Sequence, residues 1–124
     1  MKVRNIKIEI KSNDGLRKEL KETWKKIERG EEVKKHEGLY FENLEAMRKV
    51  LTEERLRILR QVKKNHPSSI YELAKLLGRD IKNTFDDVQF LSQVGLLQLK
   101  KTKDGREKTT PIVSYDKILL EIPV

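Results

Sequence analysis

The sequence has 124 residues, of which 39% are charged and 36% hydrophobic, and its 28 basic and 20 acidic side chains give a formal net charge of +8. A chain of this length is expected to form one domain with a modest core, and its basic excess favours a polyanionic partner. The sequence contains no cysteine, which excludes disulfides, thiolate metal sites and a cysteine nucleophile, and no apolar run approaches the roughly 18 residues of a membrane span.

The first residues alternate in polarity. Residues 3–11 place Ile6, Ile8 and Ile10 on one face at a period of two, which predicts a half-buried strand. This alternation differs from the continuous apolar core of a signal peptide, so we expect a cytoplasmic protein. A turn should follow, in which Asp14 caps the next helix.

Residues 15–29 predict the most charged helix of the chain. Its apolar positions recur at helical spacing and form one narrow stripe: Leu16, Leu20, Trp24 and Ile27. Such a stripe either packs along one edge of its own domain or meets a second subunit. A large aromatic side chain such as Trp24 often anchors an interface, so we expect this stripe to form a dimer interface.

A polar loop over residues 31–38 separates this helix from the rest of the chain. The apolar run at residues 39–41 after it predicts a short strand. We therefore expect two parts. Residues 1–38 are a strand-helix extension used for dimerisation, and residues 39–124 are the main domain with a C-terminal strand.

Two helices are predicted before residue 66. Asn43 is expected to cap a short helix that begins at Leu44, and Thr52 a longer helix over residues 53–65. Two acidic side chains follow Thr52 in the first turn, where the helix dipole favours them. The core face of the longer helix is expected to consist of Leu56, Leu59 and Val62, with Ile58 beside them.

Residues 67–95 hold two more helical patterns. The first, over 69–77, can begin at Ser68 or Ser69 and ends at Gly78, because glycine enters the left-handed conformation without penalty. The second, over 80–94, begins at Asp80. Its apolar face is predicted to be Ile81, Phe85, Val88, Leu91 and Val94.

Two short amphipathic helices joined by a tight glycine-containing turn are typical of a helix-turn-helix, whose second helix can enter the major groove of DNA. With the helix over 53–65 they predict a compact trihelical unit. The same spacing also occurs in helical hairpins that only fill a core, so the segments that follow decide between the two interpretations.

A basic hairpin is predicted next. Residues 96–99 indicate a strand, and residues 100–108 a charged loop with the Asp-Gly dipeptide typical of tight hairpins. A second strand is expected from Thr109 to Tyr115. This order predicts an α+β winged helix-turn-helix with a trihelical core and a C-terminal β-hairpin wing.

The C-terminal tail contains one more strand candidate. Ile118, Leu120 and Ile122 share one face, as the apolar residues of the N-terminal strand do. The two terminal strands could pair with each other. Pairing within one chain and pairing between two chains are both compatible with the pattern.

Three segments also resemble a known family. They are LTEERLRIL from Leu51, PSSIYELAKLLGRDIKN from Pro67 and DVQFLSQVGLL from Asp87. They resemble small prokaryotic winged-helix proteins, common in archaea and described as MarR-like or antitoxin-like DNA-binding transcriptional regulators. The resemblance implies a winged helix, sequence-specific DNA binding and a dimer. It is weakest over residues 1–37.

The candidate DNA-binding residues follow from the expected helix orientation. With its apolar face inward, the second helix should turn outward Arg79, Lys82, Asn83, Thr84 and Gln89. Arg suits guanine and Asn or Gln suits adenine, because each can form two hydrogen bonds at once. The hairpin cations expected at phosphates or the minor groove are Lys100, Lys101, Lys103, Arg106 and Lys108, and Ser68 or Ser69 could donate to a phosphate.

Two acidic residues oppose this assignment. Asp86 and Asp87 would repel phosphates unless they point sideways, pair with a cation or approach a cytosine amino group. We therefore expect the helix to enter the groove by its first turn only.

The sequence favours a homodimeric regulator of transcription that binds double-stranded DNA. The alternative is a protein-interaction module, antitoxin-like or an assembly factor, that would expose an apolar patch including Phe90. Double-stranded RNA binding fits the charge but lacks aromatic stacking platforms. His36 and His66 show no metal-ligand spacing, and neither a glycine-rich phosphate loop nor a nucleophile elbow is present, so we expect no enzyme, metal or cofactor.

Overall fold

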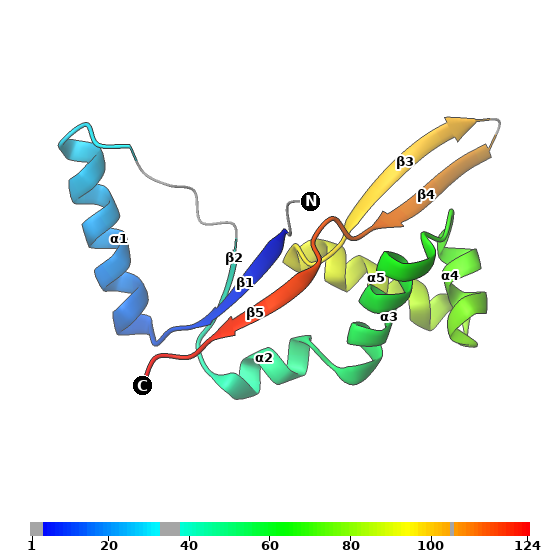
Figure 1. Ribbon diagram of the computed structural model, residues 1–124, viewed down its shortest axis with the longest axis horizontal. Coiled ribbons are helices and arrows are strands. Elements are labelled where there is room, and N and C mark those ends of the chain that lie inside the picture. The colour runs from blue at the N-terminus through cyan, green and yellow to red at the C-terminus, as the bar shows by residue number, and fades with distance from the viewer. Residues whose placement is uncertain (1–3, 33–37, 105) are drawn as a thin grey trace. The chain divides into compact units, whose positions relative to one another are not determined.

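The computed structural model describes residues 4–32, 38–104 and 106–124, without the side chains of residues 103, 104, 106 and 107. These residues form a mixed α+β fold with five helices and five strands (Figure 1). The elements are β1 (Asn5–Ile10), α1 (Asn13–Glu28), β2 (Gly38–Phe41), α2 (Leu44–Val50), α3 (Glu53–Asn65), α4 (Ile70–Leu77), α5 (Ile81–Val94), β3 (Gln98–Asp104), β4 (Arg106–Ile112) and β5 (Lys117–Glu121). None of the helices in the described ranges has the length and apolar character needed to cross a bilayer.

The chain divides into two compact units. The first comprises Met1–Val50 with Lys117–Val124, and the second comprises Leu51–Asp116. The division differs from the expected boundary after residue 38, because β2 and β5 both hydrogen-bond to β1 and so belong with the N-terminal segment.

A three-stranded parallel sheet in the order β2-β1-β5 organises the first unit. The register places Ile8 beside both Leu39 and Leu120, and Ile8 is fully buried. The predicted N-terminal strand is therefore confirmed. The terminal strands pair within one chain, which decides between the two alternatives that the sequence left open.

The opposite face of this sheet is charged. The Lys7 ammonium lies 2.7 Å from a Glu121 carboxylate oxygen, and the Lys11 ammonium lies 2.8 Å from a Glu9 carboxylate oxygen. Lys11 also pairs with Glu19 of α1. The alternation of β1 thus separates an apolar face from a face of ion pairs.

Helix α1 begins earlier than predicted and leaves its apolar stripe exposed. Ser12 is the N-cap and accepts a hydrogen bond from the Gly15 N–H at 3.3 Å, so the expectation that Asp14 caps this helix is wrong. No residue of α1 is buried, and Trp24 is 63% exposed. The Trp24 indole N–H donates to the Glu28 carboxylate at 2.9 Å. Its ring therefore remains on the surface of the chain.

Three helices and a hairpin make up the second unit, and the helices begin where the sequence predicts. Thr52, Ser69 and Asp80 each accept a hydrogen bond from a backbone N–H three residues later. Gly78 ends α4 in the left-handed conformation, with φ of 65°. The core between these elements is formed by Ile58, Leu59, Val62, Ile70, Leu73, Ala74, Leu77, Val88, Leu91, Leu96, Leu97 and Val113.

The hairpin of β3 and β4 is antiparallel and longer than predicted, because the region expected to be a loop continues both strands. The Thr110 hydroxyl donates to the Ser68 carbonyl at 2.8 Å, and the Tyr115 hydroxyl donates to the Leu96 carbonyl at 2.8 Å. These bonds attach the start of α4 and the end of α5 to the hairpin strand and the segment after it.

Helix α5 is rotated relative to the predicted orientation. Thr84 is completely buried and its hydroxyl donates to the Asp80 carbonyl at 2.8 Å, whereas Ile81 and Phe85 are 47% and 45% exposed. The expectation that Thr84 points outward while Ile81 and Phe85 face the core is therefore wrong. The bond to the carbonyl four residues earlier satisfies the hydroxyl, which allows threonine to occupy a core position.

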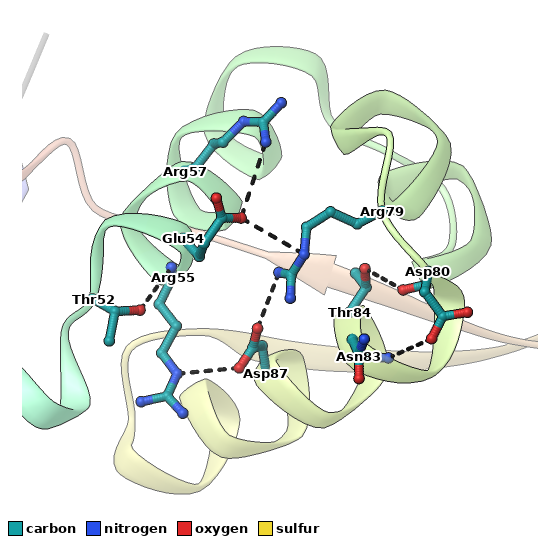
Figure 2. A network of polar contacts seen from close by, with 9 residues as sticks. All are labelled: Thr52, Glu54, Arg55, Arg57, Arg79, Asp80, Asn83, Thr84 and Asp87. Atoms are coloured by element: carbon teal, nitrogen blue, oxygen red, sulfur yellow. Dashed lines mark hydrogen bonds and ion pairs between the residues drawn. The ribbon is translucent and has the colours of Figure 1, made fainter.

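A charged network holds α5 in this rotation (Figure 2). The Asp87 carboxylate accepts from the Arg79 guanidinium at 3.0 Å and from the Arg55 guanidinium at 3.3 Å. The side chains of all three are only 20–22% exposed. Arg79 also lies 3.6 Å from a Glu54 carboxylate oxygen. The network joins α3, the turn between α4 and α5, and the middle of α5.

We expect Asp87→Ala to destabilise the protein by about 1–3 kcal/mol, because two partly buried guanidinium groups lose their shared acceptor. The measurement is the urea concentration at the midpoint of unfolding. Asp86→Ala is the matched control, since Asp86 is the exposed neighbour and its loss should change stability by at most about 0.5 kcal/mol. Equal effects of the two substitutions would contradict the role of the network.

Candidate nucleic-acid interface

The first turns of α5 present a mixed surface. Ile81, Lys82, Asn83, Phe85 and Asp86 are all exposed. Ile81 and Phe85 are four residues apart and therefore neighbours on one side of the helix, where they form a pair that we call the apolar ridge. Gln89, one turn further, is partly exposed. The predicted candidates Lys82, Asn83 and Gln89 thus belong to a surface that also contains two large apolar side chains.

Arg79 occupies a different place from the one expected. Its guanidinium is held between Asp87 and Glu54 and does not lie on the outer face of α5 (Figure 2). The same region removes the expected repulsion between Asp87 and DNA phosphates, because two guanidinium groups neutralise the Asp87 carboxylate. Arg79 is therefore a positioning residue in this fold.

Phe90 contacts Arg55, a member of the charged network. The Arg55 guanidinium carbon lies 4.0 Å from the centre of the Phe90 ring, and the ring is partly buried. The exposed large apolar side chains of the second unit are instead Tyr71, Leu76, Ile81 and Phe85. Phe90 is thus covered on one face by a guanidinium.

The two serines before α4 are engaged in capping. The Ser69 hydroxyl accepts from the Glu72 N–H at 3.1 Å, and the Ser68 hydroxyl donates to the Glu72 carboxylate at 2.6 Å. The hydrogen bonds from the Ser68 hydroxyl and backbone N–H, with the nearby Lys108 ammonium, lower the pKa of the Glu72 carboxyl from its ordinary value. A phosphate beside Ser68 would therefore meet a carboxylate that is ionised at neutral pH.

The hairpin carries its cations on both faces. Lys100 lies opposite Thr110, and Lys108 lies opposite Thr102, so these two lysines share the face of the ladder that meets the start of α4. Lys101 points to the other face. All three lysines are exposed. The predicted contacts Lys103 and Arg106 have side chains outside the described part of the chain.

The apolar ridge is the part of this surface that the sequence interpretation missed. No local pattern signalled its exposure, because Ile81 lies three residues before Thr84 and fits the same helical spacing as the buried set Thr84, Val88 and Leu91. A hydrophobicity pattern discards this set, because it begins with a polar residue.

Comparison with known proteins finds a family match in the second part of the chain. Residues 50–120 match the model of a family described as HVO_A0114. This range contains all of the second unit and the segments on which the resemblance to winged-helix regulators rests. No curated protein matches the chain. Because the match covers more than half of the 124 residues, the chain belongs to the HVO_A0114 family.

Proposed function

We propose that this protein is a winged-helix, MarR-like or antitoxin-like transcriptional regulator that binds double-stranded DNA as a homodimer. In this proposal α5 enters the major groove and the β3–β4 hairpin is the wing, which contacts the adjacent backbone or minor groove. The observation that carries it is the presence of an outward-facing α5 start and a cationic hairpin within one compact unit.

The order of elements supports the proposal. Three residues that include Gly78 join α4 to α5, and an antiparallel hairpin follows directly. The bond from the Thr110 hydroxyl to the Ser68 carbonyl fixes the hairpin beside the start of α4. The candidate recognition helix and the candidate wing therefore have defined positions in one unit.

The distribution of charge supports the same partner. Lys82, Lys100, Lys101 and Lys108 are exposed, while Asp87 is neutralised inside the charged network. Lys82 and Asn83, near the N-terminal end of α5, remain candidates for base edges, and Gln89 remains a candidate one turn later. The hairpin lysines remain candidates for phosphates, which set affinity and position without reading bases.

The dimer part of the proposal rests on α1. None of its apolar side chains is buried within the described part of the chain, and Leu20, Trp24 and Ile27 are more than half exposed. A second copy of α1 would cover these side chains and create a two-fold axis. Two recognition helices would then read half-sites about 34–36 Å apart.

A protein partner is the second candidate. The observation in its favour is that Tyr71, Leu76, Ile81 and Phe85 are exposed on α4 and α5, which an interaction module could use as anchors. In that case DNA affinity would be weak and independent of sequence.

Selection from a random duplex library with the purified protein at near-physiological salt tests the proposal. A palindromic consensus is expected, and its half-site spacing reports the dimer geometry. Retention that shows no consensus and disappears as salt rises would contradict sequence-specific regulation and favour a protein partner.

We expect replacement of both Lys101 and Lys108 by Ala to lower the slope of log K against log salt by about 0.9 for each phosphate that the variant no longer neutralises. The measurement is fluorescence anisotropy of a labelled consensus duplex over a range of salt concentrations. Lys21→Ala on α1 removes the same type of charge at an exposed position and should leave the slope unchanged. A slope that is the same in all variants would remove the hairpin from the DNA interface.

If α1 forms the dimer interface, Trp24→Ala should shift sedimentation from a dimer towards the 14.6 kDa monomer. Truncation of an aromatic anchor at an interface commonly costs about 2 kcal/mol or more of binding free energy. Lys21→Ala, on the same helix, again serves as the control. A variant that remains fully dimeric would exclude Trp24 as an anchor.

A further inference from the structure

We propose that the apolar ridge, Ile81 and Phe85, reads thymine by contact with its 5-methyl group in the major groove. This inference rests on the proposed DNA-binding function and adds a base preference to it. The residues concerned were expected in the core, and their exposure is a property of the folded chain.

The position of the ridge on α5 suits contact with bases. Ile81 is the first residue of the helix and Phe85 lies about one turn later. The fully buried side chains of α5 are those of Thr84, Val88 and Leu91, whereas about half of each ridge side chain is exposed. The end of a recognition helix that normally reaches base edges is its N-terminal end.

Base edges in the major groove differ in how favourably they can contact an apolar side chain. Hydrogen-bond donors and acceptors occupy most of each base-pair edge there, and thymine adds one methyl group. An apolar side chain pressed against an amino group or a carbonyl would remove water without replacing its hydrogen bonds, which is unfavourable. Against a methyl group the same side chain buries apolar surface on both partners. The ridge should therefore favour thymine over the other bases.

The surroundings of the ridge favour DNA over an apolar protein surface. Lys82 lies between Ile81 and Phe85 in sequence and is exposed on the same helix. Asp86 is exposed on the same helix turn, and a carboxylate can accept a hydrogen bond from a cytosine amino group. A surface that combines apolar, cationic and acidic side chains suits base edges flanked by phosphates.

The spacing of the ridge limits which thymines it can read. Four residues of helix rise about 6 Å, whereas neighbouring base pairs are about 3.4 Å apart. Ile81 and Phe85 therefore fit methyl groups separated by about one or two base-pair steps. Each half-site should contain thymines at this separation, on one strand or on both.

Replacement of thymine by deoxyuridine in the selected consensus duplex tests the inference, because it removes the methyl group and keeps every hydrogen-bonding group. Binding is measured by anisotropy at constant salt, with one thymine replaced at a time. We expect one or two positions in each half-site to weaken binding about 3- to 10-fold, as one buried methyl group implies. This measurement uses the unmodified protein, so no variant needs to fold.

Ile81→Ala and Phe85→Ala then assign each methyl group to a side chain. Each variant should bind the thymine duplex more weakly and should lose the difference between thymine and deoxyuridine at one position. Lys82→Ala is the matched control, since it should weaken binding to both duplexes by the same factor. Both ridge residues are exposed, and circular dichroism verifies that the variants remain folded.

Two results would overturn the inference, and they differ in what they say of the function. Sequence-specific binding with no loss on any deoxyuridine replacement would reject methyl readout and leave the DNA-binding proposal intact. Failure of the selection to yield any consensus would reject both, and the ridge would then be assigned to a protein partner.

Discussion

The contact of the Asp87 carboxylate with two guanidinium groups determines what the second unit can present to a partner. Arg55 reaches it from α3 and Arg79 from the turn before α5, at 3.3 and 3.0 Å. A carboxylate that accepts from two sides has little rotational freedom, and charge-assisted bonds in a partly buried site are stronger than those on the surface. The rotation of α5 about its own axis is therefore set near its middle by charge and at its start by the Thr84 hydroxyl.

This rotation changes which side chains the candidate site exposes. An α5 with Ile81 and Phe85 inward would present only polar and charged groups, whereas the observed helix presents an apolar ridge beside Lys82 and Asp86. The network also removes two charged residues from the outer surface, since Arg79 and Asp87 bind each other. The proposed mode of recognition thus follows from intramolecular electrostatics as much as from the residues that would contact DNA.

Local signals in the sequence predicted the helix starts and the main turn. Thr52, Ser69 and Asp80 cap helices because a short polar side chain there meets a free N–H of the first turn. The end of α4 at Gly78 was predicted in the same way, because the positive φ at this position is unfavourable for other residues. The rotation of α5 could not be predicted from the sequence, because it depends on the carbonyl that accepts from Thr84 and on Arg55, which lies 32 residues from Asp87. The length of the hairpin was missed for a related reason: Lys100, Lys101 and Thr102 have no apolar alternation, and backbone hydrogen bonds alone define their strand.

For the terminal strands too, local sequence patterns predicted the elements but not the contacts between distant segments. The alternation of β1 and β5 predicted that each has one apolar face, and Ile8 confirms this for β1. Their parallel register and the pairing of β2 with β1 depend on contacts between distant segments, which no local pattern contains. The sequence therefore predicted the strands and the possible pairing of the two terminal ones, but not their register or the place of β2 in the sheet.

The most direct test of the central claim, that the start of α5 and the hairpin form one DNA-binding surface, is a titration of ¹⁵N-labelled protein with the selected duplex. We predict that the amide resonances of residues 81–86 and of Lys100, Lys101 and Lys108 move most on binding. Changes confined to α1 or to the β2-β1-β5 sheet, with α5 unaffected, would contradict the claim.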